Sequence, residues 1–233
     1  MKKKISVIIG GTRGIGKEIF STLKKRGDTV FNISRNNSNN KNDISADLNK
    51  TSDLKLIKNK FKNLKIDNLI FSHRYRGSDE NDEIRVMVQS TNNLIKLFLN
   101  HFKKNSAIVI LSSIGTRTVA DQNEIYHLTR AALESLAKYY ACRLGSYGVR
   151  VNCIQPGKTL KKENIRYFKS KYKKNKKIIE NITPLKKMGT SKDIANVVDF
   201  LTSEKSTFVT GVIMPVDGGL RLVSQEYIAK LFD

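Results

Sequence analysis

The sequence is poor in the side chains that cross-link proteins or hold metal ions. Its 233 residues include two cysteines, Cys142 and Cys153, and three histidines. Two cysteines are too few for a disulfide framework or a C-x-x-C metal site, and the scattered histidines do not form a zinc motif. We therefore expect no metal site and a reducing compartment.

Long apolar runs are also missing. The chain starts with the basic segment Met1–Lys4, and the short stretch Ile5–Ile9 that follows is its first apolar run. An export signal needs an apolar core of ~7–15 residues, and a helix that spans a bilayer needs ~20. We expect a cytoplasmic protein without a membrane partner.

Acidic residues are scarce, because 21 Asp and Glu stand against 43 Lys and Arg, which gives a net charge of +22. Such an excess of basic residues suggests a nucleic acid as a partner. A chain of this length is usually one domain, and no repeat or linker divides it. Its hydrophobic content of 39% excludes a disordered or collagen-like chain. We predict a single domain over residues 1–233.

Short runs rich in β-branched residues predict the strands, which we expect at Ile5–Ile9, Thr29–Ile33, Asn68–Phe71, Ala107–Leu111, Val149–Ile154 and Val212–Val216, with a short extra strand near Ile44–Ala46. Between these runs, apolar residues recur at helical spacing. Apolar strands that alternate with amphipathic helices are typical of a parallel sheet covered on both faces. We predict an α/β fold, a single doubly wound Rossmann-type domain with a mainly parallel sheet of about seven strands.

A glycine-rich turn, Gly10-Gly11-Thr12-Arg13-Gly14-Ile15-Gly16, follows the first expected strand. A strand-to-helix turn that lacks Cβ atoms lets the backbone approach a pyrophosphate at the helix N-terminus. The spacing is G-x-x-x-G-x-G, and no Gly-Lys-Ser/Thr sequence indicates a nucleotide triphosphatase. We interpret the turn as a cradle for the phosphates of a dinucleotide. The alternative is a tight turn that binds nothing.

The end of the second expected strand distinguishes between two dinucleotides. An acid there usually binds the free 2′-hydroxyl of NAD(H), whereas the 2′-phosphate of NADP(H) requires a cation. The residue at this place is Arg35, and Arg13 lies in the glycine-rich turn. The sequence therefore favours NADP(H) over NAD(H), against the alternative that Arg35 is only solvated.

A second group of motifs occurs in a characteristic order along the chain. The motifs are Asp47-Leu48, Leu111-Ser112-Ser113, Tyr126-His127-Leu128-Thr129-Arg130, Val151–Gly157 and Val216–Gly219, and Tyr126 lies thirteen residues after Ser113. Together with the glycine-rich turn, and over essentially the whole chain, they resemble the short-chain dehydrogenase/reductase family. Within that family the chain is most similar to 3-oxoacyl-carrier-protein reductases and to related sugar and polyol dehydrogenases.

The resemblance implies a reaction in which Tyr126 is the general acid for carbonyl reduction and Ser113 hydrogen-bonds the substrate oxygen. The residue four positions after the tyrosine would hold the nicotinamide ribose, and its charge would favour the phenolate form. Positions 126 and 130 share one face of a helix. The cofactor contacts that we expect are Gly10, Thr12, Arg13, Gly14, Ile15, Gly16, Arg35, Asp47, Leu48, Pro156 and Gly157.

The sequence departs from the family's pattern at three places. Position 130 is Arg130 instead of lysine, and an arginine supplies charge and donors but does not release a proton. Phe71-Ser72-His73-Arg74 replaces the usual Asn-Asn-Ala-Gly, and Gln89 takes the place expected of an active-site asparagine. Two interpretations follow. The chain is a working reductase, re-protonated by solvent through His73, Gln89 or water, or a pseudoenzyme that binds cofactor or a partner without turnover.

The segment Lys158–Lys177 follows Pro156-Gly157, where the family places its mobile substrate-covering helices. It carries ten Lys or Arg residues and one acid, Glu163. We expect a basic substrate lid at about 158–187, with Arg74 and Arg76 on the opposite side of the cleft, because arginine forks suit phosphate or carboxylate groups. The predicted substrate is a small anionic molecule: an acyl-carrier or coenzyme A thioester, a sugar phosphate or a nucleotide-activated sugar.

Two alternatives to an anion-binding lid account for the excess of basic residues. A basic helix with interleaved aromatic residues, here Tyr167, Phe168 and Tyr172, can bind the backbone of nucleic acids. No helix-turn-helix, zinc-finger or RNA-binding motif accompanies it, so nucleic acid is disfavoured. The second alternative is a lysine-rich composition on a solvated helix, with no function of its own.

The family resemblance also implies an assembly of several copies. We expect a homodimer or homotetramer built through helices at about Asp82–Phe102 and Tyr126–Leu144.

Overall fold

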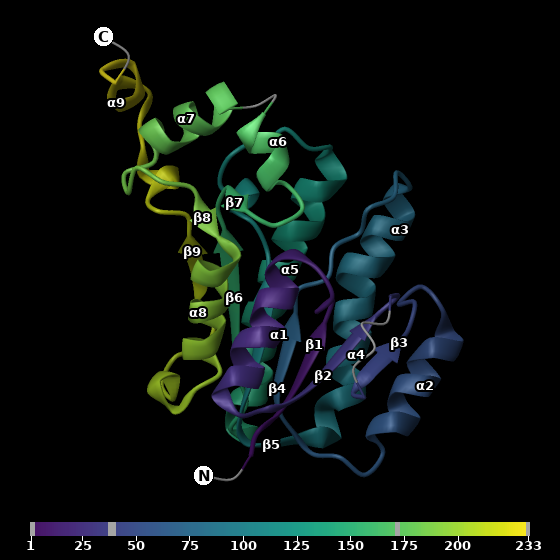
Figure 1. Cartoon of the computed structure of the whole chain (residues 1–233). Helices are drawn as coiled ribbons and strands as arrows, with labels where there is room; N and C mark the ends of the chain where they lie inside the picture. The colour runs from purple at the N-terminus through teal and green to yellow at the C-terminus, as the bar shows by residue number, and fades with distance from the viewer. Residues whose placement is uncertain (1–2, 37–40, 171–172, 232–233) are drawn as a thin grey trace.

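A seven-stranded parallel sheet forms the centre of the protein in a computed structural model, which describes residues 3–36, 41–170 and 173–231 (Figure 1). The strands are β1 (Ile5–Ile9), β2 (Thr29–Ser34), β3 (Asp43–Ser45), β4 (Ile66–Phe71), β5 (Phe102–Leu111), β6 (Arg150–Pro156) and β9 (Ile213–Val216). Their order is β3-β2-β1-β4-β5-β6-β9. The order reverses beside β1, so the carboxyl ends of β1 and β4 form the switch point where such sheets bind ligands. The predicted doubly wound Rossmann-type fold is confirmed.

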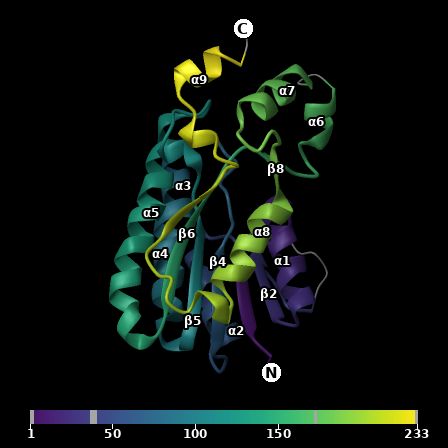
Figure 2. The same cartoon turned by 90° about the vertical axis from the view of Figure 1, so that its left-hand side faces the viewer.

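Helices cover both faces of the sheet (Figure 2). They are α1 (Gly14–Arg26), α2 (Thr51–Phe61), α3 (Glu80–Ile84), α4 (Ser90–Phe98), α5 (Glu124–Leu144) and α8 (Ser191–Leu201). The apolar residues of α1 and α8 share one core, and those of α2, α4 and α5 share the core on the other face. A π-helical turn, Arg85–Gln89, joins α3 to α4.

The strands are apolar on both sides because both sides are covered. In β1, Val7 and Ile9 belong to the core beneath α2, α4 and α5, whereas Ile8 belongs to the core beneath α1 and α8. All three side chains are at most 1% exposed. Continuous burial of this kind explains why the strands occur in the sequence as unbroken apolar runs.

The main differences from the sequence-based expectation lie at strand ends and in one small sheet. β4 and β5 begin earlier than predicted, at Ile66 and Phe102, because their first residues are less uniformly apolar than their centres. A two-stranded parallel sheet, β7 (Thr159–Leu160) with β8 (Gly189–Thr190), was not predicted. Strands of two residues are too short to produce a periodic pattern.

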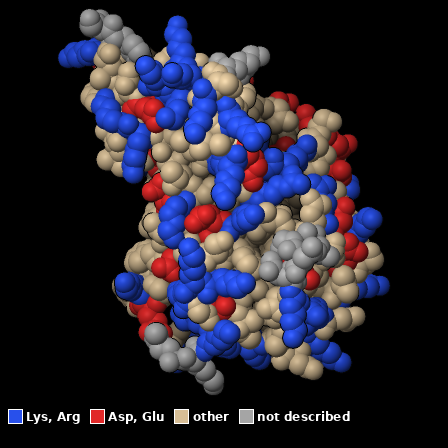
Figure 3. Space-filling model, in the orientation of Figure 1, with Lys and Arg blue, Asp and Glu red and all other residues tan. Residues whose placement is uncertain are grey.

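The lid contains two short helices above the carboxyl ends of the strands, α6 (Ile165–Lys169) and α7 (Lys173–Ile182) (Figure 1). Lys and Arg side chains gather over this part of the surface (Figure 3). Lys171 and Tyr172 lie outside the described residues. A last helix, α9 (Gln225–Ala229), follows β9. Within the described ranges, every helix is too short or too polar to cross a membrane.

An aromatic cluster joins α2 and α4 to the sheet. The ring of Phe61 lies 5.2 Å from that of Phe31 on β2 and 5.0 Å from that of Phe98 on α4, edge to face in both cases. Phe61 and Phe98 are fully buried. Edge-to-face pairs of this kind contribute beyond the area that they bury. The cluster therefore supports β2, whose carboxyl end enters the candidate site.

We expect Phe61→Ala to lower the free energy of unfolding by about 3–5 kcal/mol, because it leaves a cavity and removes two ring contacts. Urea unfolding followed by circular dichroism measures the change. Leu56→Ala is the matched control, since Leu56 is on the same helix but 50% exposed. Equal losses in the two variants would contradict the role of the cluster.

Candidate active site

The turn between β1 and α1 depends on glycine. A Cβ atom on Gly16 would lie 2.0 Å from the carbonyl oxygen of Gly10, and one on Gly10 would lie 2.6 Å from the Cα atom of His73. Gly10 and Gly14 also have positive φ angles, of 88° and 52°. These glycines bring the N-terminus of α1 against the ends of β1 and β4, so backbone N–H groups point toward the switch point.

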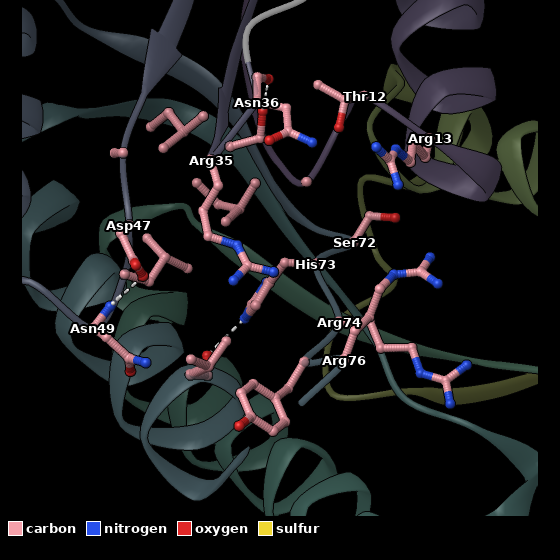
Figure 4. A pocket seen from close by; sticks show the side chains of 18 residues that line it. Thr12, Arg13, Arg35, Asn36, Asp47, Asn49, Ser72, His73, Arg74 and Arg76 are labelled. Carbon is pink, nitrogen blue, oxygen red and sulfur yellow. Dashed lines mark hydrogen bonds between the residues drawn. The ribbon is translucent and has the colours of Figure 1, made fainter. Parts of the chain in front are cut away.

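A hollow opens beside this turn, and we call it the glycine-loop hollow (Figure 4). Among its lining residues are Gly10, Thr12, Arg13, Arg35, Asp47 and Leu48, all of which the sequence analysis assigned to the cofactor. Arg35 extends into the hollow toward His73 (Figure 4). Ile15 packs against the core beneath α1 and α8 instead. The predicted cofactor contacts are thus six of the 18 residues that line the hollow, and Gly14 and Gly16, like Ile15, do not line it.

His73 contributes a neutral ring to the same hollow. Its Nε2 atom lies 2.9 Å from the carbonyl oxygen of Val86, which assigns the proton to Nε2, and its Nδ1 atom is buried without a hydrogen-bond partner. Burial is the main cause that lowers the pKa of His73 to about 4, with a smaller contribution from the charge of Arg130, while the Val86 contact opposes them. A buried lone pair without a donor is available to a ligand.

Ser113 and Tyr126 converge around Gly115. A Cβ atom on Gly115 would lie 3.3 Å from the Ser113 hydroxyl and 3.4 Å from a carbon of the Tyr126 ring. Ser113 precedes a 3₁₀ turn, and its oxygen accepts a 3.0 Å hydrogen bond from the Gly115 N–H. Tyr126 lies in the first turn of α5, whose N-cap is Asn123. The Ser113 hydroxyl proton is thus free to donate to another oxygen.

Arg130 lies one helical turn after Tyr126 and is 4% exposed. Its guanidinium carbon lies 4.8 Å from the centre of the Tyr126 ring, and its Nε atom has no hydrogen-bond partner. Burial is the main cause that lowers the pKa of the Arg130 guanidinium, and Arg74 adds to it, whereas Tyr126 and Glu83 oppose it. The group remains a cation, because an arginine starts from a pKa far above neutral.

A second hollow lies on the other side of Tyr126, and we call it the tyrosine hollow. It is lined by Arg74, Arg76, Glu83, Gln122 and Tyr126, among others. Arg74 donates a 2.9 Å hydrogen bond to Gln122, and its guanidinium carbon lies 5.6 Å from the centre of the Tyr126 ring. Arg74, Tyr75 and Arg76 line both hollows, so the two hollows meet at this segment.

Gln89 does not take the place expected of the active-site asparagine. It is exposed at the end of the π-helical turn and lines neither hollow. Met87 within the turn and Ser90 directly after it are buried instead. Ser90 donates a 3.1 Å hydrogen bond to the carbonyl oxygen of Leu48, at the wall of the glycine-loop hollow.

Pro156 and Gly157 end β6 and lead into the lid. The Gly157 N–H donates a 3.0 Å hydrogen bond to the carbonyl oxygen of Val216, and a Cβ atom on Gly157 would lie 2.8 Å from the Cα atom of Asp217. Their main visible role is to pack the start of the lid against β9. Neither residue lines the glycine-loop hollow or the tyrosine hollow.

Two acids at the site were not predicted from the sequence. Glu83 is 8% exposed, lines the tyrosine hollow and accepts a 3.5 Å hydrogen bond from Thr129. Nothing in its local sequence distinguished it from the neighbouring acids at the start of α3. Glu163 of the lid accepts a 2.8 Å hydrogen bond from the Gly14 N–H. Its isolation in a run of basic residues was the signal, but the contact spans 149 positions of the chain.

Comparisons with known proteins find similar chains. A family model described as Enoyl-(Acyl carrier protein) reductase matches residues 73–221. An L-rhamnose-1-dehydrogenase from Scheffersomyces stipitis is 38% identical over 50% of this chain and 45% of its own length. An NADH-dependent enoyl-acyl-carrier-protein reductase from Buchnera aphidicola is 34% identical over 52% of this chain and 46% of that protein. The chain thus spans less than half the length of these two curated relatives.

Two other comparisons extend over almost the whole chain. A 3-oxoacyl-acyl-carrier-protein reductase from Buchnera aphidicola is 28% identical, with 94% of this chain and 98% of that protein covered. The crystal structure of a short chain dehydrogenase family protein from Francisella tularensis has a TM-score of 0.84 at 28% identity. It covers 94% of this chain and 99% of that one.

Proposed function

This chain belongs to the short-chain dehydrogenase/reductase family, and from that premise we propose that it transfers a hydride between NADP(H) and a carbonyl or alcohol group of an anionic substrate. The observation that carries the proposal is Tyr126, which stands beside Ser113 and the buried Arg130 and lines the tyrosine hollow. The names of the similar proteins, which are dehydrogenases and reductases, favour an enzyme over a cofactor-binding protein without turnover.

The residues present fit a nicotinamide dinucleotide. The close contact of Gly16 with Gly10 brings the N-terminus of α1 to the switch point, where its backbone N–H groups suit a diphosphate. The partnerless Nε of Arg130 is a buried donor that suits a ribose hydroxyl. Asp47 and Leu48 line the end of the glycine-loop hollow that an adenine would occupy. When bound, the cofactor supplies or accepts the hydride.

Arg35 supports NADP(H) over NAD(H). It extends from the end of β2 into the glycine-loop hollow, where a free ribose hydroxyl would call for an acid instead. A guanidinium fork suits a phosphate monoester. Similar proteins do not decide the matter, because one of them is named as NADH-dependent.

In the direction of reduction, Ser113 and Tyr126 act on the substrate oxygen. The Ser113 oxygen already accepts the Gly115 N–H, so its own proton is directed outward and donates to the carbonyl oxygen. The Tyr126 hydroxyl donates its proton to the same oxygen as negative charge develops there. The phenolate that remains is stabilised by the guanidinium groups of Arg130 and Arg74 beside the ring.

Arg130 orients and stabilises but does not carry the proton. Its guanidinium does not deprotonate under ordinary conditions, so a relay through this residue is closed. Tyr126 is half-buried and lines the tyrosine hollow, and we infer that water reaches its hydroxyl through this hollow. We propose that Tyr126 recovers its proton from this water rather than from Gln89, which lines neither hollow.

The tyrosine hollow suits an anionic substrate. Arg74 and Arg76 both line it, and the basic lid lies above the same ends of the strands. Converging cations raise the local concentration of an anion and hold it against Tyr126. An acyl-carrier or coenzyme A thioester, a sugar phosphate and a nucleotide-activated sugar all meet this requirement. The names of the similar proteins include both acyl-carrier and sugar substrates.

We also propose that the protein is a cytoplasmic homodimer or homotetramer that pairs through α4 and α5. α5 is the longest helix of the described residues, and it exposes Leu128 and Tyr139 at 62% and 55%. Two large apolar side chains exposed on one helix suit a contact between copies of the chain.

Tyr126→Phe is expected to lower kcat/KM for NADPH-dependent reduction by roughly 10²–10⁴-fold, because it removes the proton donor. NADPH absorbance, followed across a panel of carbonyl compounds, measures the rate; NADPH fluorescence measures binding, which we expect to be unchanged. Tyr147→Phe, on a residue that is 73% exposed, is the control. Tight NADPH binding by the unaltered chain with no turnover on any carbonyl would contradict the enzyme.

Arg35→Gln is expected to raise the KM for NADPH by roughly 10–100-fold and to leave the KM for NADH nearly unchanged, because it removes a charged bond to the 2′-phosphate. The ratio of kcat/KM for the two cofactors reports the change. Lys41→Gln, an exposed cation before β3, serves as the matched control. A parallel loss with both cofactors would argue for a structural role of Arg35.

Arg76→Glu and Arg74→Glu are expected to raise the KM for an anionic substrate by roughly tenfold or more, through repulsion in the tyrosine hollow. An uncharged analogue of the same carbonyl should lose far less. Lys60→Glu, an exposed reversal on α2, controls for net charge. An unchanged KM for the anion would remove the basis for an anion clamp.

A further inference from the structure

The N-terminus of α1 lacks the residues that usually satisfy such an end. The N-cap residue is Arg13, its side chain makes no capping hydrogen bond, and the first turn contains no acid. The first N–H groups of a helix have no partner within the helix, and together with the helix dipole they attract an anion. This end of α1 therefore requires a negative group from elsewhere.

The negative group that meets it is the carboxylate of Glu163, from the lid. The Gly14 N–H donates a 2.8 Å hydrogen bond to Glu163 Oε1. Burial opposes ionisation, but the N–H groups of Glu163 and Gly14, and then Lys161 and Arg76, outweigh it and lower the pKa of the carboxyl. A charged carboxylate thus stands where a dinucleotide fold holds a diphosphate.

The turn that positions Glu163 is held by hydrogen bonds of the Asn164 side chain. Asn164 Oδ1 accepts a 2.6 Å hydrogen bond from the Lys161 N–H, and Asn164 Nδ2 donates to the carbonyl oxygen of Thr159 at 3.1 Å. Thr159 belongs to β7, which pairs with β8 ahead of α8. The position of Glu163 over the glycine-rich turn therefore follows from hydrogen bonds and not from a loose segment.

Lys161 lies against the same turn with the opposite charge. Its Cδ atom would be 3.4 Å from a Cβ atom on Gly14, so its stem runs across the N-terminus of α1. Burial is the main cause that lowers the pKa of Lys161, followed by the charges of Arg74 and Arg76, while Glu163 opposes them. Lys161 is thus a partly buried cation whose charged neighbours include Arg74, Arg76 and Glu163.

We propose that Glu163 and Lys161 form a charge switch for the diphosphate of a dinucleotide. Without cofactor, the Glu163 carboxylate occupies the N-terminus of α1. On binding, the diphosphate takes this position and displaces Glu163, while Lys161 stays and pairs with the phosphate charge. The inference rests on the proposed nicotinamide cofactor, and it assigns opposite effects to two residues that are two positions apart.

Electrostatics require the exchange. The Glu163 carboxylate is exposed, but it accepts the Gly14 N–H that a diphosphate would use, and two anions at one helix end repel each other. The diphosphate brings more negative charge than Glu163, so it also offsets the crowding of Lys161 with Arg74 and Arg76. Glu163 therefore competes with the cofactor, and Lys161 favours it.

The test is an NADPH fluorescence titration without substrate. Glu163→Gln is expected to lower the Kd by roughly 5- to 20-fold, and Lys161→Gln to raise it by a similar factor. Glu180→Gln and Lys162→Gln are the controls in the lid, since Glu180 pairs with Lys176 at 3.1 Å and Lys162 is exposed. Both controls are expected to change the Kd less than about twofold, because neither side chain forms a hydrogen bond or ion pair with α1 among the described residues, and solvent screens their charges.

A second measurement separates this inference from the proposed function. Inorganic pyrophosphate is added to the cofactor-free chain, and the melting temperature is recorded. The rise should be larger for Glu163→Gln than for the unaltered chain and smaller for Lys161→Gln. Hydrogen exchange at the Gly14 amide should be faster in Glu163→Ala, which removes the acceptor, than in the unaltered chain.

The two measurements distinguish a failure of the charge switch from a failure of the proposed function. If no nicotinamide cofactor binds but pyrophosphate gives the expected order, the charge switch stands and the proposed function falls. If NADPH binds and Glu163→Gln weakens the binding or leaves it unchanged, the switch is overturned and the proposed function stands. Equal Kd values for Lys161→Gln and Lys162→Gln would overturn the part assigned to Lys161.

Discussion

The close approach of α1 to the end of β1 is the contact on which the rest of the site depends. Only a residue without a Cβ atom fits at Gly16, because any other side chain would meet the Gly10 carbonyl oxygen at 2.0 Å. This packing aims the backbone N–H groups of α1 at the switch point of the sheet. Arg13, Arg35 and Arg74 line the same hollow, so the site combines a helix dipole with guanidinium groups. Such a combination of positive groups raises the local concentration of anionic ligands.

The positive charge of the site is unfavourable where its cations are buried, and few acidic residues lie nearby to offset it. Arg130 is buried without a salt bridge among the described residues, and Lys161 is crowded by neighbouring arginines. A buried cation without a partner is unfavourable unless nearby groups offset it. Glu83 and Glu163 provide part of the offset, each from a different side. An anionic ligand would supply the remainder, which links the basic composition of the chain to the chemistry that we propose.

The sequence predicted the parts of this arrangement that local patterns encode. Apolar runs located the seven strands of the main sheet, and the glycine-rich turn located the end of α1. The spacing of Ser113 and Tyr126 anticipated that they meet, because a loop after β5 and the first turn of α5 share Gly115 as a neighbour. Gln89 is exposed at the end of a π-helical turn, and the sequence did not predict this turn, which changes which side chains face inward. The contact of Glu163 with Gly14 could not be predicted from local sequence, since it joins segments far apart in the chain.

Because position 130 is an arginine, the proposed reaction needs another route by which a proton returns to Tyr126. A lysine there could pass a proton onward, but Arg130 only stabilises charge beside the Tyr126 ring. In the proposed reaction the proton must therefore return through water in the tyrosine hollow, which Arg74 and Gln122 close on one side by their 2.9 Å hydrogen bond. An anion held at Arg74 and Arg76 would occupy this hollow. Proton return would then follow release of the product, so the residues that hold the substrate would also set the order of the steps.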